Sequence, residues 1–167
     1  MIFENKCKTI INETNKKEKG YDSTVDAKAH IEIIQKIMNK VIDSLKDRSI
    51  NHDKSKLEDP ERSMYDKYIP MLKTTKYGSE EYYDIREKMQ KEGLDHHYEV
   101  NSHHPEHYEN GIDGMDLIDL IEMYCDWKAA SSKSDTSFEK GLESNAKRFK
   151  MSDQLLSIFK NTSKNGY

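Results

Sequence analysis

The stretch from Ser23 to Arg48 most constrains the fold, because apolar residues recur along it every three or four positions. This period places apolar side chains on one face of an α-helix, and Ser23 followed by Asp26 is typical of a helix start. Across the chain, 34% of the residues are hydrophobic and 35% are charged. We therefore expect a core made from narrow apolar stripes on amphipathic helices. The stripe on this first helix comprises Ala27, Ile31, Ile34, Ile37, Met38, Val41 and Leu45.

Helical patterns also occupy most of the remaining chain, whereas no segment shows the alternation expected of a strand. Pro60 and Pro105 should each end the helix before them, and Pro70 should end or kink another. Gly93 should weaken the middle of the helix that leads to Pro105. The expected helices cover residues 50–57, 61–73, 79–104, 115–130, 138–149 and 155–159. The sequence thus predicts an all-α, single-domain helical bundle.

The length of 167 residues corresponds to about one domain. We expect an N-terminal arm or short helix over residues 1–22, the helical domain over 23–160 and a tail over 161–167. A net charge of −4 without a long basic block argues against binding to duplex nucleic acid. No window reaches the length of a membrane span, so no membrane partner is expected. The sequence leaves a homo-oligomer open.

The two cysteines, Cys7 and Cys125, are far apart in the sequence and cannot form a disulfide framework. Such sparse cysteine usage fits a reducing compartment, so a cytoplasmic protein is expected. The frequent lysine, asparagine and isoleucine residues indicate an AT-rich bacterial or bacteriophage genome.

Five of the seven histidines lie between Leu94 and His107. At helical spacing, His97, Asn101 and His104 share one stripe, and His96 and His103 form an adjacent one. Neutral imidazoles on neighbouring turns suit a divalent metal ion or a phosphate, because one ring nitrogen can bind while the other is held by an outer partner. The alternative is a polar, tyrosine-rich surface in which the histidines share no role.

The segment from Met115 to Ala130 places three carboxylates on one stripe of a helix that is apolar on both sides. Asp119, Glu122 and Asp126 form this stripe. A helix of this kind is usually buried, and buried carboxylates need cations to offset their desolvation. Metal ions or protonated histidines would meet that need. The alternative is that the stripe faces solvent.

A His-Asp pair, His52 and Asp53, offers a nitrogen and an oxygen ligand next to each other. Mixed nitrogen and oxygen ligands favour Mn, Fe, Zn or Co. His30 lies on the apolar face of the first helix, where a lone imidazole needs a buried partner. A satisfied core histidine would explain His30 alone, but not all of these features together.

In their order, His30, His52-Asp53 and Asp126 resemble the ligand series of the HD-domain metal-dependent phosphohydrolases, an all-helical superfamily. The segment "HDKSK" is similar to the His-Asp-x-Gly-Lys form of several of its branches, with Ser55 in place of the glycine. A closer resemblance is to an uncharacterised bacterial and bacteriophage family that combines motifs like "HDKSK", "HHYEVNSHH" and "EMYCDW". The resemblance covers about residues 26–130. The likeness to the HD superfamily implies that His30, His52, Asp53 and Asp126 bind a divalent metal.

The resemblance implies a metal-dependent phosphohydrolase that uses metal-activated water on a small phosphorylated molecule, with a nucleotide or cyclic nucleotide preferred. The cofactor would be one or two ions of Mn, Mg, Zn, Co or Fe. Coordination lowers the pKa of the attacking water towards about 7. Asp53, as a ligand of this metal, would be a catalytic residue. Lys56 lies one turn after His52, where its ammonium could bind a substrate phosphate.

The roles of the remaining candidates stay open at this point. His97 and His104 are either ligands of a second metal, with Glu122 as a further ligand, or general acids for the leaving oxygen. Asn101 and His103 are candidate substrate-binding residues, Asn101 as an orienter or hydrogen-bond donor. Three tyrosines could stack a base, namely Tyr98, Tyr108 and Tyr124.

Three other functions are compatible with the same residues. A few proteins that resemble the HD superfamily contain redox iron pairs, so a di-iron oxygenase is one alternative. Another is a non-catalytic helical module that binds a nucleotide or a partner. A purely structural bundle would bind no metal specifically.

Overall fold

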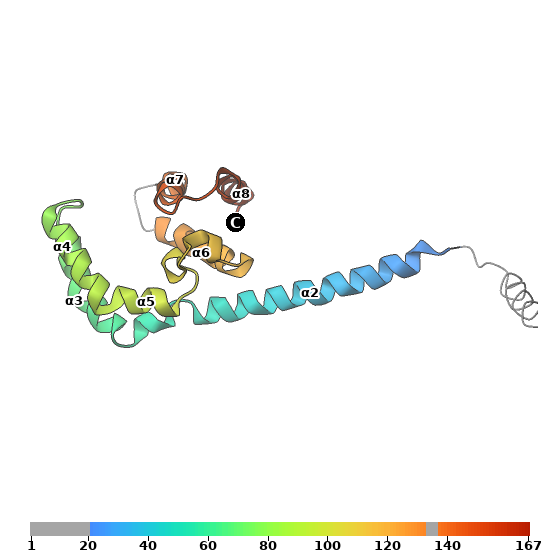
Figure 1. Cartoon of the computed structure of the whole chain (residues 1–167), viewed down its shortest axis with the longest axis horizontal. Coiled ribbons are helices and arrows are strands. Elements are labelled where there is room, and N and C mark those ends of the chain that lie inside the picture. The colour runs from blue at the N-terminus through green and yellow to red at the C-terminus, as the bar shows by residue number, and fades with distance from the viewer. Residues whose placement is uncertain (1–20, 133–136) are drawn as a thin grey trace, which may run out of the picture. The chain divides into compact units, whose positions relative to one another are not determined.

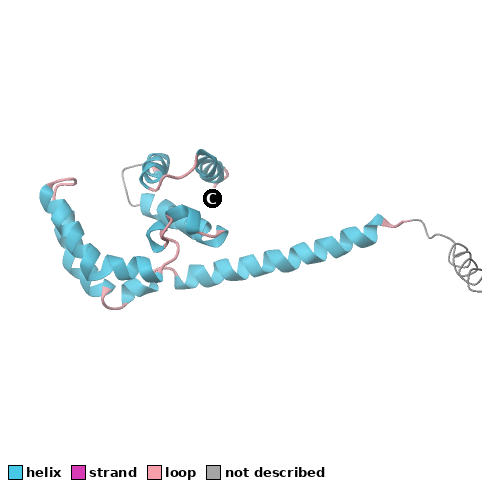
Figure 2. Ribbon diagram, in the orientation of Figure 1, coloured by secondary structure: helices cyan, strands magenta, loops and turns pink. Residues whose placement is uncertain are grey.

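The computed structural model describes residues 21–132 and 137–167, and every regular element within them is helical (Figure 2). This confirms the all-α fold class. The chain divides into two compact units, one ending at Asp43 and the other covering Ser44–Tyr167. Most of the predicted arm, residues 1–20, lies outside the described residues. Within the described ranges, no helix is long and apolar enough to cross a membrane.

The first unit contains the N-terminal part of α2, a helix that runs from Ser23 to Asn51. The apolar stripe expected to be buried is exposed there, with Ile31 at 53% and Ile37 at 54% of full exposure. His30 is exposed as well, so the expectation that it is embedded in a buried apolar face was wrong. The physical reason is that, among the described residues, this unit is a single helix, which has no second element to cover its apolar side.

The second unit begins with the last turns of α2 and continues through all the other described elements (Figure 1). These elements are η1 (Lys54–Leu57), α3 (Glu61–Thr74), α4 (Glu80–Met89), η2 (Gln90–Leu94), α5 (Asp95–Val100), η3 (Pro105–His107), η4 (Gly111–Gly114), α6 (Leu117–Ser131), α7 (Phe138–Arg148) and α8 (Asp153–Lys164).

The second unit has two separate apolar cores. The first joins α3, α4 and η2, and its buried residues are Met64, Tyr68, Ile85, Met89 and Leu94. The second joins α6, α7 and α8 and the turn between the last two, and its buried residues are Met123, Tyr124, Leu142, Ala146, Met151 and Phe159. Each core buries the apolar stripes of amphipathic helices. This is the kind of core expected from the low fraction of hydrophobic residues. The stretch from α5 to η4 therefore connects two independently packed groups of helices.

Several helix boundaries differ from the sequence expectations. Residues 50–57 are not one helix, because α2 continues to Asn51 and a short 3-10 turn follows over Lys54–Leu57. α3 continues past Pro70 to Thr74. The last helix extends to Lys164, beyond the domain boundary expected at residue 160.

The helix that carries the histidines ends at Val100 instead of at Pro105. Asn101 has an extended backbone, and its side-chain amide donates to the carbonyl oxygen of His97 at 2.9 Å. His104 is extended too, as a residue before proline tends to be. Consequently, residues 101–104 form a turn, and the helical stripe expected for His97, Asn101 and His104 does not exist.

Between α4 and α5 the helical path continues through a π-helical segment, Gln90–Leu94. Gly93 lies in this segment against α3, where an added Cβ would be 2.9 Å from Cβ of Met64. Gly93 therefore permits a close helix contact, in addition to having the low helix propensity noted from the sequence. The contact lies just before the two histidines at the start of α5.

Candidate metal centre

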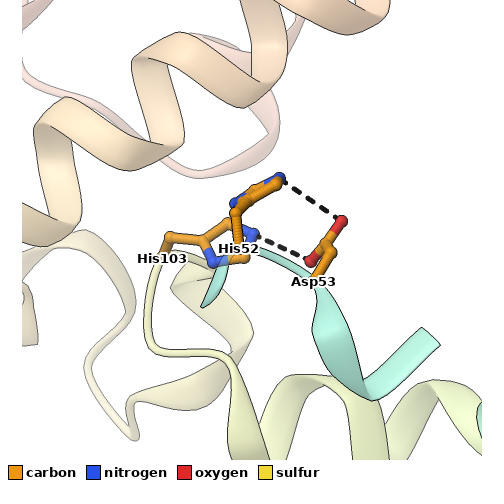
Figure 3. A group of neighbouring side chains, drawn as sticks. All are labelled: His52, Asp53 and His103. Carbon is orange, nitrogen blue, oxygen red and sulfur yellow. Dashed lines mark ion pairs between the residues drawn. The ribbon is translucent and has the colours of Figure 1, made fainter. Parts of the chain in front are cut away.

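Six imidazole and carboxylate side chains converge in the second unit. We call them the His-Asp cluster, which comprises His52, Asp53, His97, His103, His104 and Asp126. His52 and Asp53 lie in the turn between α2 and η1, and the others come from α5, the turn after α5, and α6. Three of them, His52, Asp53 and His103, are drawn in Figure 3, where both imidazoles face the carboxylate.

Ligand atoms of the cluster lie close enough to bind a metal ion. Three overlapping groups each have all their ligand atoms within 4.8 Å of one another. These groups are His52-Asp53-His103, Asp53-His97-His104 and His103-His104-Asp126. The Nε2 atoms of His97 and His104 are only 2.8 Å apart. The turn at residues 101–104 thus brings His104 back to His97 although the two do not share a helix face.

Two buried ligand atoms have no hydrogen-bond partner among the described residues, namely Asp53 Oδ1 and His103 Nε2. They are 3.5 Å apart, and His97 Nε2 is 3.6 Å from the same carboxylate oxygen. A buried polar atom left without a partner costs about 1–3 kcal/mol. A cation bound among these atoms would remove that cost, so the donor set fits a divalent metal.

Outer carboxylates hold His97 and His52 through Nδ1, so that their Nε2 atoms face other members of the His-Asp cluster. Glu61, at the start of α3, is fully buried, and its two oxygens lie 2.7 Å from Nδ1 of His97 and 2.9 Å from Nδ1 of His96. Since an ionised carboxylate only accepts hydrogen bonds, both Nδ1 atoms donate. His52 Nδ1 likewise donates to Glu122 Oε1 at 2.8 Å. Such carboxylate-histidine pairs are typical of metal sites.

Burial keeps the inner imidazoles neutral, which leaves a lone pair on each for a metal. For His104, burial and the neighbouring His103 and His97 lower the pKa to about 3. Burial also lowers the pKa values of His97 and His103, although nearby carboxylates oppose this effect. A histidine must be neutral to bind a metal, and His97, His103 and His104 meet that condition at neutral pH.

Asp53 has a left-handed backbone, with φ of 54°. This conformation is uncommon for residues other than glycine, although aspartate tolerates it better than most. Its Oδ2 accepts a hydrogen bond from Lys56 Nζ at 2.5 Å. Burial alone would raise the pKa of Asp53, but Lys56, His52 and His97 hold it below its ordinary value. Asp53 is therefore a carboxylate at neutral pH, with one oxygen bound to a lysine and the other without a partner.

The carboxylate stripe of α6 faces the interior, as expected from its position on a helix that is apolar on both sides. Arg48 neutralises two of its members, donating to Asp119 Oδ1 at 2.7 Å and to Glu122 Oε2 at 2.8 Å. Asp119 also accepts hydrogen bonds from Ser102 and Tyr108. Burial alone would raise its pKa, yet these partners lower it to about 2.

Some predicted site residues lie in the His-Asp cluster, some lie beside it, and His30 lies in the other unit. Five residues predicted as metal ligands lie in the His-Asp cluster, namely His52, Asp53, His97, His104 and Asp126. His103, predicted to bind substrate, joins them as a sixth donor. Glu122, predicted as a further ligand, contacts His52 and Arg48, and no candidate metal group includes it. Asn101 donates to Ser55 Oγ at 2.8 Å and to the His97 carbonyl, which fits an orienting role.

His30 is not among the residues of the candidate metal groups. It belongs to the first unit, and its exposed side chain has none of the burial from which its role was inferred. Its assignment as a ligand therefore stays a prediction.

Glu61 and Arg48 were not predicted as site residues. Glu61 follows Pro60 in a segment with no motif, and Arg48 is one of 27 basic residues. One available signal was the buried carboxylate stripe of α6, which required a cation. The sequence could not indicate which of the many basic side chains supplies it.

Comparison with known proteins assigns the chain to a family whose function is unknown. Residues 19–165 match a family model described as a family of unknown function, DUF5662. No curated protein and no solved structure matches the chain.

Proposed function

This chain belongs to the DUF5662 family of unknown function, and from the geometry of the His-Asp cluster we propose that it is a metal-dependent phosphohydrolase. One observation carries the proposal. The buried oxygen of Asp53 and the buried nitrogen of His103 face each other at 3.5 Å without a hydrogen bond. A cation bound between these two atoms would satisfy the lone pairs that the folded chain holds without a partner. The resemblance of "HDKSK" to a motif of HD-type phosphohydrolases supports the same reaction.

The metal would be held by the His-Asp cluster, with Glu61 and Glu122 orienting His97 and His52. Four imidazoles with two carboxylates favour Mn, Fe, Zn or Co over Mg, which prefers oxygen ligands alone. Since the candidate groups overlap, one ion or two could be accommodated, and the stoichiometry is a direct readout. When bound, a divalent ion lowers the pKa of a coordinated water and polarises a phosphoryl oxygen.

Lys56 and Asp53 act next to the reacting phosphate in this proposal. The Lys56 ammonium lies against Asp53, and the Lys56 side chain is 36% exposed, so the ammonium can reach a phosphate oxygen that approaches the cluster. Its positive charge would offset charge that develops on the phosphoryl group. His97 and His104 serve as ligands rather than as general acids, because they form a candidate metal group with Asp53 and burial keeps both imidazoles neutral.

The first prediction concerns Asp53→Asn and His103→Gln. Each variant should lose most of the metal that co-purifies with the protein, and should hydrolyse phosphate esters at least 100-fold more slowly, because each removes a ligand. Metal content is measured by mass spectrometry. Hydrolysis is measured on a panel of nucleotides, cyclic nucleotides and phosphomonoesters with added Mn, Mg, Zn, Co or Fe.

His107→Gln is the matched control, because His107 is exposed and is not part of any candidate metal group among the described residues; its ring contacts the carbonyl oxygen of Tyr98 and the ring of Tyr108. It should keep both metal and activity. Unchanged hydrolysis in folded Asp53→Asn would overturn the proposal. His30→Gln, measured alongside, shows whether His30 is needed for metal binding.

The same preparation distinguishes the two alternatives that share the donor set. A di-iron oxygenase would show bound iron with an optical spectrum that changes in air. A non-catalytic binding module would bind a ligand without turnover under every metal. The cytoplasmic location and the absence of duplex nucleic acid as a partner remain expectations from the sequence.

A further inference from the structure

A pocket of about 360 Å³ opens beside the His-Asp cluster, between the last turns of α2 and one side of α6. Two of its lining residues, His52 and Asp126, belong to the cluster, and a third, Glu122, orients His52. A phosphate held at the cluster would therefore have its organic group at the mouth of this pocket. The volume is at the small end of the range for ligand sites.

The remaining walls of the pocket are small or apolar. They are formed by Leu45, Ser49, Ile121, Cys125 and Ala129. No phenylalanine, tyrosine or tryptophan ring lines it, and its one imidazole, His52, belongs to the His-Asp cluster, so a nucleobase would find no uncommitted ring to stack on. An apolar wall of this kind favours an apolar ligand group through the hydrophobic effect.

The tyrosines expected to stack a base are occupied elsewhere. Tyr124 is buried in the core of α6, α7 and α8, where its hydroxyl donates to the carbonyl oxygen of Tyr167 at 2.7 Å. The Tyr108 hydroxyl donates to Asp119 at 2.6 Å. Tyr98 packs against the rings of His97 and His104. None of the three lines the pocket.

The charges around the pocket disfavour additional phosphate groups. Arg48 is the one basic residue among the lining side chains, and it already donates to Asp119 and Glu122. Asp126 and Glu122 add negative charge to the same wall. A diphosphate or triphosphate that extended into this pocket would meet carboxylates without a free cation, and this repulsion would weaken its binding.

We propose that this pocket receives the organic group of the substrate, and that this group is small, apolar and attached to a single phosphate, unlike a nucleotide. The proposal rests on the proposed function for its assignment of the phosphate to the His-Asp cluster. It narrows the substrate class from small phosphorylated molecules to phosphate monoesters of small apolar alcohols.

The test uses three probes with the metal-loaded full-length protein, and binding is measured by titration calorimetry. Phenylphosphonate has an apolar ring on a phosphorus-carbon bond that is not a hydrolysable ester. Methylphosphonate has the same head group without the ring, and AMP has a nucleoside. Phenylphosphonate should bind at least tenfold more tightly than either of the others, because only its ring fills the apolar pocket.

Ala129→Leu fills the pocket from an exposed position on α6. It should weaken phenylphosphonate binding at least fivefold and leave both methylphosphonate binding and metal content unchanged. Ala130→Leu is the matched control, because Ala130 is also exposed but lines a different hollow with Trp127. This control should leave all three affinities unchanged.

The pocket assignment is overturned if AMP binds as tightly as phenylphosphonate, or if Ala129→Leu does not weaken phenylphosphonate binding. Phenylphosphonate binding with the expected variant effect supports the assignment even when no phosphate ester is hydrolysed. In that case it is the phosphohydrolase activity that fails, so the two proposals can be told apart.

Discussion

Glu61 illustrates how a single residue can organise several others. Its carboxylate is fully buried and lies against the Nδ1 atoms of both His96 and His97. By accepting these two hydrogen bonds it fixes the tautomer of His97, which turns Nε2 of His97 towards Asp53 and His104. The geometry of the His-Asp cluster thus depends on a residue that is not itself a candidate ligand.

Glu61→Gln should weaken metal affinity by about 10–100-fold, the usual effect of losing an outer carboxylate. In the glutamine amide only the oxygen accepts hydrogen bonds, because the NH2 group is a donor. One of the two imidazoles therefore loses its acceptor and its orientation. Metal affinity is measured by competition with a chromogenic chelator. Glu58→Gln, at an exposed position one turn earlier, is the control and should leave affinity unchanged. An unchanged affinity in Glu61→Gln would show that His97 is oriented without it.

At the scale of elements, the π-helical segment and the turn after α5 determine where the histidines lie. Gly93 allows this segment to approach α3, the helix that begins with Glu61. The turn at residues 101–104 then reverses the chain, so that His103 and His104 meet the other donors. Neither feature follows the regular helical period.

Gly93→Ala should destabilise the fold by up to about 2 kcal/mol, although alanine is the better helix former. The added Cβ would be 2.9 Å from Cβ of Met64, and overpacking of this kind costs about 1–3 kcal/mol, more than the roughly 1 kcal/mol gained in helix propensity. Stability is measured by urea unfolding.

Gly141→Ala is the matched control for this prediction. Gly141 lies within α7, and a Cβ there would meet no atom within 4 Å. This substitution should stabilise the protein by about 0.5–1 kcal/mol. If both variants shifted stability in the same direction, helix propensity alone would account for Gly93.

At the scale of the whole second unit, the Arg48 network joins parts of the chain that belong to neither apolar core alone. It links the end of α2, through Arg48, with Asp119 and Glu122 of α6 and with Ser102 in the turn after α5. Asp119 is only 2% exposed, so its charge depends on these partners. We expect this network to dominate the acid sensitivity of the unit.

The pKa of Asp119 is about 2 in the folded protein, below its ordinary value of 3.8. A carboxyl group with a lowered pKa stabilises the fold above its unfolded pKa, and this contribution is lost as pH falls through the folded value. Unfolding free energy should therefore decrease between about pH 4 and pH 2, with about 2 kcal/mol of the loss due to Asp119.

Asp119→Asn tests this assignment through urea unfolding at pH 7, 4 and 2.5. The variant should be less stable than the wild type at pH 7, and the difference should shrink at pH 2.5, where the wild-type carboxylate begins to be protonated. Asp113→Asn, at an exposed position, should follow the wild type throughout. A constant difference between Asp119→Asn and the wild type would mean that Asp119 is not responsible.

The helical class and most donor identities could be predicted from the sequence, because both depend on local properties. A helical period is visible in any short window, and imidazoles next to carboxylates have the same ligand chemistry wherever they lie. His52, Asp53, His97 and His104 were proposed as donors in this way, and all four lie in candidate metal groups, although the helical stripe proposed for the latter pair was wrong. Asp126 was proposed as a ligand from the resemblance to the HD superfamily.

Only the tertiary structure decided which donors share one centre and which partners hold them. Glu61 and His97 are 36 residues apart, and Arg48 and Glu122 are 74 apart. Such contacts arise from the packing of separate helices and from a chain reversal before Pro105, and no local pattern encodes them. The burial of α2 was mispredicted for a related reason, since an apolar stripe shows that a helix can pack but does not specify the surface against which it packs.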